Sequence, residues 1–147
     1  MSQLLAHFFG DYILQSDWMA TNKTKHLHVA MIHALVYSCC FIPLTWHHGP
    51  FCFLTIFATH VVIDRFRLAR YVVWAKNWLG PVRACYDCNK WGRECHEIHY
   101  SPATQPLAEC TATGYPPSTP IWLSTWLLII ADNTLHLAIN SAALRWL

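Results

Sequence analysis

Three pairs of histidine and aspartate recur in apolar stretches of the chain, with four residues from one member of a pair to the other. A helix turns once every ~3.6 residues, so both members of such a pair would project from the same face. A further apolar stretch carries one histidine. The set comprises His7, Asp11, His33, His60, Asp64, Asp132 and His136. Imidazole and carboxylate are ligands that suit zinc, manganese and iron, so the set predicts a divalent-metal centre, with zinc as the first candidate.

The chemistry expected of such a centre is hydrolysis. Seven ligands exceed the needs of one tetrahedral ion, and they suit either two ions about 3.5 to 4 Å apart or one ion with carboxylates that orient the histidines. A bound ion would lower the pKa of its water towards about 7 and polarise a phosphoryl or acyl oxygen. We expect Asp11 and Asp64 to act as catalytic carboxylates. Gln15, one turn after Asp11, would orient substrate or water.

Each polar residue also has a simpler interpretation. A single histidine inside a helical bundle can hydrogen-bond a carbonyl on the next helix, and Gln15 can do the same in helix packing. Asp64 can pair with Arg65 or Arg67 in an ordinary salt bridge, and Asp11 can cap a helix. The recurrence of the set favours a metal or proton-handling centre, because ionisable residues inside hydrocarbon are costly and normally functional.

The elements that would position these residues are apolar helices in a membrane. Hydrophobic residues make up 54% of the 147-residue chain and charged residues 12%, about half the charged share of a soluble domain. Helices are expected over residues 3–19, 29–46, 51–74 and 121–143, with turns at "TNKTK" and "HHGP". The predicted fold is therefore all-α, a four-helix membrane-embedded bundle in a single domain, 1–147. The soluble alternative would have a poorly solvated surface.

Basic residues predict an orientation. Lys and Arg lie between the first and second segments and after the third, whereas "HHGP" has none. Basic loops face the cytoplasm, which predicts that the long segment after the third helix lies on the cytoplasmic side of the membrane. The net charge of +2 gives no support for nucleic-acid binding.

A cysteine- and proline-rich insertion, 80–120, separates the third and fourth segments. It holds four cysteines with partial zinc-knuckle spacing, namely Cys85, Cys88, Cys95 and Cys110. A second, structural zinc and disulfides or free thiols are both open interpretations, and a cytoplasmic location favours zinc. A loop of this length is also a candidate surface for a protein partner.

Four stretches, "LLAHFFGDYILQSDWMA", "IHALVY", "THVVIDRFRLARY" and "ADNTLHLAI", resemble the domain of unknown function 3307 family. Its members are small multi-helix proteins of phages and bacteria, generally regarded as membrane proteins. The resemblance covers residues 4–71 and 121–143. The recurrent polar positions that it implies are His7, Asp11, Gln15, His33, His60, Asp64, Asp132 and His136. The long insertion departs from the compact family pattern.

Two functions are therefore expected to compete. The first is a metal-dependent hydrolase of a phosphate- or acyl-containing small molecule or lipid near the membrane. The second is a non-enzymatic membrane module, in which the centre holds an ion structurally or passes protons or metal while the insertion binds a protein partner. For a phage protein, the second function would mean acting on the host envelope.

Overall fold

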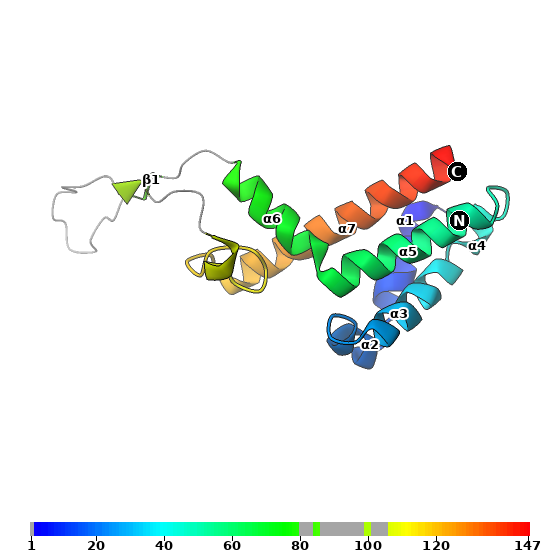
Figure 1. Ribbon diagram of the computed structural model, residues 1–147, viewed down its shortest axis with the longest axis horizontal. Coiled ribbons are helices and arrows are strands. Elements are labelled where there is room, and N and C mark those ends of the chain that lie inside the picture. The colour runs from blue at the N-terminus through cyan, green and yellow to red at the C-terminus, as the bar shows by residue number, and fades with distance from the viewer. Residues whose placement is uncertain (1, 80–83, 86–98, 101–105) are drawn as a thin grey trace. The chain divides into compact units, whose positions relative to one another are not determined.

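The computed structural model describes residues 2–79, 84–85, 99–100 and 106–147 (Figure 1). The helices are α1 (Gln3–Phe8), the π-helix η1 (Phe9–Ile13), α2 (Asp17–Asn22), α3 (Leu27–Cys39), α4 (Ile42–Thr45), α5 (Pro50–Phe66), α6 (Leu68–Trp78), the 3-10 helix η2 (Leu107–Glu109) and α7 (Ile121–Trp146). Strands β1 (Ala84–Cys85) and β2 (His99–Tyr100) form one short antiparallel pair, with Ala84 opposite Tyr100. The described part of the chain is thus almost wholly helical, which confirms the predicted all-α class.

The chain divides into two compact units. One comprises Met1–Ala69 and Ile129–Leu147, and the other comprises Arg70–Leu128. All the predicted His/Asp residues belong to the first unit. Whether the whole chain folds as a single domain stays a prediction.

The first segment is broken, so the prediction of one helix over residues 3–19 is wrong. The Ser2 hydroxyl caps α1 by accepting a hydrogen bond from Leu5 N at 3.3 Å. The wider turn η1 follows, and the chain leaves helical geometry before Ser16, whose hydroxyl caps α2 by accepting from Met19 N at 3.3 Å. A serine at the N-cap position favours the start of a new helix, and Ser16 lies within the segment that was predicted to be one helix.

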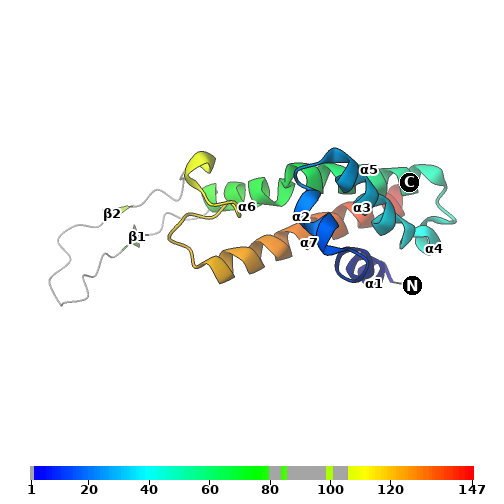
Figure 2. The same cartoon turned by 90° about the horizontal axis from the view of Figure 1, so that it is seen from below.

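Helices α3 and α5 form the main helix pair of the first unit (Figure 2). The chain reverses between them through α4 and Gly49, whose φ of 83° favours glycine, and Pro50 opens α5. Helix α5 stops at Arg67, which has a left-handed φ of 52°, and α6 follows. The prediction of one helix over residues 51–74 is therefore also wrong.

The interior of the first unit is polar beside a small apolar core. The apolar cluster consists of Ala6, Tyr37, Phe41, Cys52, Ile56 and Ala143. Outward-facing residues are large and apolar: Ile13 is 67% exposed, Trp46 76% and Phe51 75%. Large exposed apolar side chains, together with ionisable side chains in the interior, distinguish this unit from a typical water-soluble bundle.

Among the helices of the described residues, α7 alone is long and apolar enough to cross a membrane. Helices α3 and α5 have 13 and 17 residues, short of the ~20 that span a bilayer without help. Helix α5 is shortened by its end at Arg67, and α3 by the turn at Cys40 and Phe41 before α4 begins. That four helices cross a membrane stays a prediction.

In the second unit, the end of the predicted insertion packs on α6. Arg70 Nη2 donates a hydrogen bond to Leu107 O at 3.2 Å, and the Lys76 ammonium lies 5.4 Å from the centre of the Tyr115 ring. Burial raises the pKa of the Cys110 thiol in this region. Cys88 and Cys95 lie outside the described residues, so the second zinc site stays a prediction.

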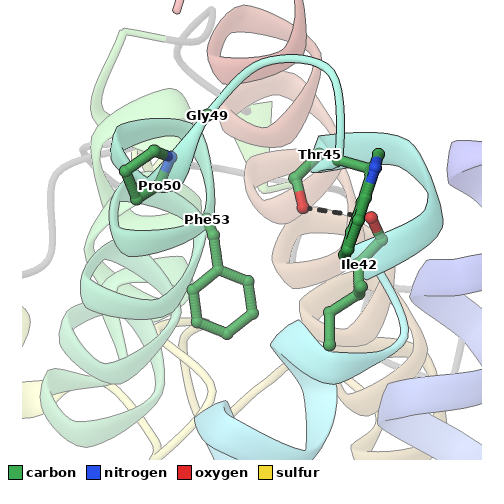
Figure 3. A pocket seen from close by; sticks show the side chains of 6 residues that line it. Ile42, Thr45, Gly49, Pro50 and Phe53 are labelled. Carbon is green, nitrogen blue, oxygen red and sulfur yellow. Dashed lines mark hydrogen bonds between the residues drawn. The ribbon is translucent and has the colours of Figure 1, made fainter.

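An apolar pocket lies at the reversal between α4 and α5 (Figure 3). Its lining residues are Ile42, Thr45, Trp46, Gly49, Pro50 and Phe53. The Thr45 hydroxyl donates to Phe41 O at 3.1 Å and lies 3.4 Å from Ile42 O. Since these six residues include no ionisable side chain, we place no chemistry in this pocket.

Candidate metal centre

The predicted His/Asp residues converge inside the first unit, although they come from four separate parts of the chain. Three overlapping groups have ligand atoms close enough to share a metal ion: Asp11, His60 and His136; His33, His60 and Asp64; Asp64, Asp132 and His136. Six of the seven predicted ligands thus belong to at least one group. These buried side chains could hold a metal ion.

The tightest group is a nearly equilateral triangle of donor atoms. His33 Nε2 lies 3.1 Å from His60 Nε2, and each of these nitrogens lies 3.2 Å from Asp64 Oδ2. Donor atoms at about 2.0 to 2.1 Å from one tetrahedral zinc are about 3.3 Å apart, so the triangle resembles one face of such a site. All three residues are buried, at 0%, 1% and 5% exposure.

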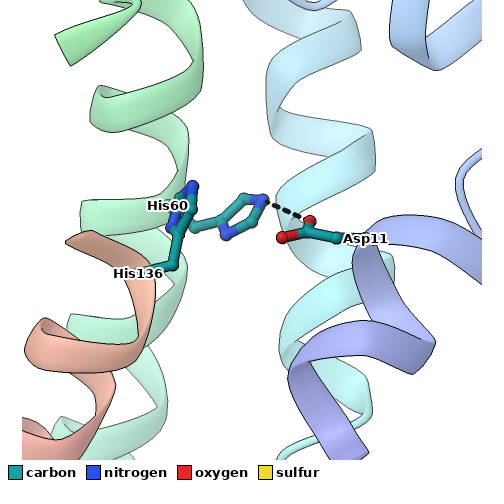
Figure 4. Close-up of side chains that lie close together, drawn as sticks. All are labelled: Asp11, His60 and His136. Atoms are coloured by element: carbon teal, nitrogen blue, oxygen red, sulfur yellow. Dashed lines mark ion pairs between the residues drawn. The ribbon is translucent and has the colours of Figure 1, made fainter. Parts of the chain in front are cut away.

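Asp11 adds a carboxylate to the same two imidazoles. Its Oδ1 lies 3.3 Å from His33 Nε2 and 3.5 Å from His60 Nε2. Figure 4 shows Asp11 and His60 facing each other, with the His136 ring beside that of His60. The π-helix η1 carries Asp11, and Gly10 allows the close approach, because a Cβ there would lie 2.7 Å from Tyr37 Cδ2. Wide turns of this kind are frequent at functional sites.

Helix α7 supplies the remaining pair. His136 Nε2 lies 3.6 Å from Asp64 Oδ1 and 3.7 Å from Asp132 Oδ2. Asp64 therefore faces His33 and His60 with one oxygen and His136 with the other. The Asp132 side chain is 33% exposed, against 9% for Asp11 and 3% for Asp64, so the centre is most open at Asp132.

His7 lies beside the centre with both ring nitrogens occupied. Asn140 Nδ2 donates to the Tyr37 hydroxyl at 2.6 Å, which leaves that hydroxyl free to donate to His7 Nδ1 at 2.8 Å. His7 Nε2 then donates to Asn133 Oδ1 at 2.8 Å. The arrangement favours a supporting role for His7, and its role as a metal ligand stays a prediction.

The centre fits a cation because several of its buried polar atoms lack hydrogen-bond partners. Among the described residues, Asp11 Oδ1 and His136 Nε2 have none that meets hydrogen-bond geometry, and Asp64 Oδ2 is met by the Lys23 ammonium, 2.9 Å away, in an ion pair. Buried carboxylate oxygens without such partners are costly. The neighbouring imidazole nitrogens at 3.2 to 3.5 Å are themselves metal donors, so a shared ion would satisfy both kinds of atom.

Tyr37 holds the His60 ring in place. The two rings are stacked, with centres 3.8 Å apart and planes at 25°. The Nδ1 atoms of His33 and His60 have no hydrogen-bond partner within the described part of the chain. Ring packing therefore takes the orienting role that a hydrogen bond has in many metal sites.

Gln15 is not where the sequence placed it. It follows η1 in the non-helical link before Ser16, so it does not continue a helical face from Asp11, and none of the three ligand groups includes it. Its buried Oε1 has no hydrogen-bond partner among the residues the structure describes. The catalytic role assigned to it stays a prediction.

Sequence reasoning missed Tyr37, Asn133, Asn140 and Lys23 as site residues. Two of them follow the same one-turn spacing that identified the pairs: Tyr37 is four residues after His33, and Asn140 is four residues after His136. Applying that spacing to hydroxyl and amide residues would have found both. Lys23 approaches from a turn, where helical spacing has no bearing.

Comparison with known proteins places the first half of the chain in a family. The family described as "Protein of unknown function (DUF3307)" matches residues 1–79, which carry Asp11, His33, His60 and Asp64. The chain belongs to this family. The DUF3307 match ends before Asp132 and His136, which complete the centre from α7. No curated protein and no solved structure matches the chain.

Proposed function

We propose that this DUF3307 protein is a membrane-embedded, metal-dependent hydrolase that acts on a phosphate- or acyl-containing substrate. The observation that carries the proposal is the donor triangle of His33 Nε2, His60 Nε2 and Asp64 Oδ2, with edges of 3.1 to 3.2 Å. Zinc is the first candidate, and manganese or iron would suit the same nitrogen and oxygen donors.

Membrane embedding is supported by the distribution of side chains. The first unit buries histidine and aspartate and exposes leucine, phenylalanine, isoleucine and tryptophan. Lipid is the solvent that favours such a surface, and it explains why the ionisable groups gather inside. Helix α7 is long enough to cross a bilayer. We place the protein in the inner membrane of a bacterial cell, with the 80–120 segment on the cytoplasmic side.

The roles of the residues follow from their positions. His33, His60 and Asp64 would hold the ion, and His136 and Asp132 would complete the site or hold a second ion that shares Asp64. A bound divalent cation supplies Lewis acidity, which activates water and polarises a substrate oxygen. Asp11 would take the proton from the attacking water, since its buried Oδ1 lacks a hydrogen-bond partner among the described residues. Substrate would approach at Asp132, where the centre is most exposed.

A second candidate function rests on the burial of the triangle. The side chains of His33, His60 and Asp64 are at most 3% exposed, which also suits a structural ion closed off by protein ligands. The protein would then be a membrane module that binds a protein partner through residues 80–120. The partial exposure of Asp132 favours the hydrolase, because a catalytic site needs an open position.

The test is turnover by the full chain, purified in detergent and supplied with zinc or manganese. The substrates would be a chromogenic phosphomonoester, a phosphodiester and an acyl ester. We expect the wild type to hydrolyse at least one of them, and Asp64→Asn to be slower by at least about 100-fold. Lys25→Met, which changes an exposed residue, is the matched control and should keep full activity. Equal turnover by wild type and Asp64→Asn would contradict the hydrolase assignment.

A further inference from the structure

One basic side chain reaches into the centre from outside the ligand set. Lys23 Nζ lies 2.9 Å from Asp64 Oδ2 and 3.3 Å from His33 Nε2, so it contacts two corners of the donor triangle. Its side chain is 16% exposed, which places it between the buried ligands and the surroundings. The positively charged Lys23 ammonium therefore contacts the same donor atoms that would bind a metal ion.

The turn that carries Lys23 is anchored at two points. Lys23 N donates to Met19 O at 2.9 Å and ends α2. Arg65 Nη1 donates to Thr24 O at 2.7 Å, which ties the turn to the end of α5, next to Asp64. The four-carbon stem of Lys23 is flexible, so its ammonium can leave Asp64 without rearrangement of the helices.

A lysine ammonium and a divalent cation cannot share Asp64 Oδ2 comfortably. An ion about 2.1 Å from that oxygen would lie within about 5 Å of the present position of Nζ. Like charges at such a distance repel strongly in a buried site. Metal binding would therefore displace the ammonium towards the partly exposed side of the centre, where it would need another anion.

We propose that Lys23 is the substrate-anion-binding residue of the centre, that it pairs with Asp64 until a divalent cation takes that carboxylate, and that the group it then binds is a phosphate. Lysine is a common phosphate ligand, acting as a point charge. A phosphate held beside a divalent cation would have its charge neutralised from two sides. The inference rests on the proposed metal centre and specifies the class of substrate.

The experiment measures two affinities in the detergent-solubilised full chain: that of zinc, and that of phosphate in the zinc-loaded protein. Phosphate is offered both as inorganic phosphate and as phosphatidic acid in mixed micelles, so the two arms distinguish a free ligand from a lipid headgroup. The variants are Lys23→Met, the charge-retaining Lys23→Arg, and Lys25→Met as the exposed control from the same turn.

We expect Lys23→Met to bind zinc about tenfold more tightly, because the competing ammonium is gone. We also expect it to bind either inorganic phosphate or phosphatidic acid at least about tenfold more weakly than the wild type does. Lys23→Arg and Lys25→Met should bind phosphate as the wild type does. Unchanged phosphate affinity in Lys23→Met, or no phosphate binding by the zinc-loaded wild type, would overturn the assignment of Lys23 alone. A wild type that binds no zinc would overturn the metal centre as well.

Discussion

The Tyr37 hydroxyl joins three elements of the centre, and its removal should have a measurable cost. Asn140 of α7 donates to it at 2.6 Å, and it lies 2.8 Å from His7 Nδ1 of α1. A hydrogen bond between helices in a membrane protein contributes about 0.6 kcal/mol on average and about 1.7 kcal/mol at most. Tyr37→Phe loses two such bonds but keeps the ring that stacks on His60. We therefore expect the free energy of unfolding to fall by about 1 to 3 kcal/mol, with little change in metal affinity.

The assay is reversible unfolding in mixed detergent micelles, with Tyr12→Phe as the matched control. The Tyr12 hydroxyl accepts from Asn133 Nδ2 at 2.8 Å and donates to Asn133 Oδ1 at 3.1 Å, but Tyr12 is half exposed, so the loss of its hydroxyl should cost less than about 0.5 kcal/mol. Tyr37→Phe combined with Asn140→Leu should cost less than the sum of the two single changes, because both partners of one bond are then apolar. Equal effects for Tyr37→Phe and Tyr12→Phe, or strict additivity in the double variant, would show that the Tyr37 hydroxyl does not join these elements.

Three further predictions concern packing, protons and metal. Gly10→Ala should lower the free energy of unfolding by about 1 to 3 kcal/mol, since its Cβ would meet Tyr37 at 2.7 Å; wild-type stability would contradict that packing. Zinc affinity, measured by titration calorimetry, should fall as the pH is lowered from about 7.5 to about 5.5, because protons compete for the imidazoles; a flat profile would exclude histidine ligands. A chelator should lower the melting temperature of the zinc-loaded wild type but not that of Asp64→Asn, and equal shifts would place the ion elsewhere.

The convergence of the His/Asp pairs could be predicted because helical periodicity is a local property. His60 and Asp64 lie on one continuous stretch of α5, as do Asp132 and His136 on α7, so their spacing alone places each pair on one face. Asp11 joins the other ligands although it lies on an irregular helix. The π-helix η1 begins after His7 and carries Asp11 before the chain leaves helical geometry ahead of Ser16. The cost of burying ionisable groups supplied the reason for all of them to face inward.

The breaks in the helices could not be predicted from the apolar pattern. Arg67 takes a left-handed conformation that a sequence would assign to glycine, and α5 ends there. The link at Gln15 depends on the serine cap at Ser16, which apolar periodicity does not register. These local backbone conformations explain why the helices predicted over residues 3–19 and 51–74, of 17 and 24 residues, are divided into shorter elements.

The long-range partners of the centre were also beyond sequence reasoning. His7 and Asn133 are 126 residues apart, and Tyr37 and Asn140 are 103 apart. Contacts at such separations depend on how α7 packs against α1 and α3. The ammonium of Lys23 reaches Asp64 from a turn whose polar residues indicate only solvent exposure when read locally.

The most direct test of the metal centre is elemental analysis of the purified full chain, with wild type beside His60→Ala and Asp64→Asn. The latter variant preserves side-chain size while removing the charge that the ion needs. We expect at least about one zinc, manganese or iron ion per wild-type chain, and loss of that metal in both variants. Metal content that is unchanged in both variants would contradict the assignment of His60 and Asp64 as ligands.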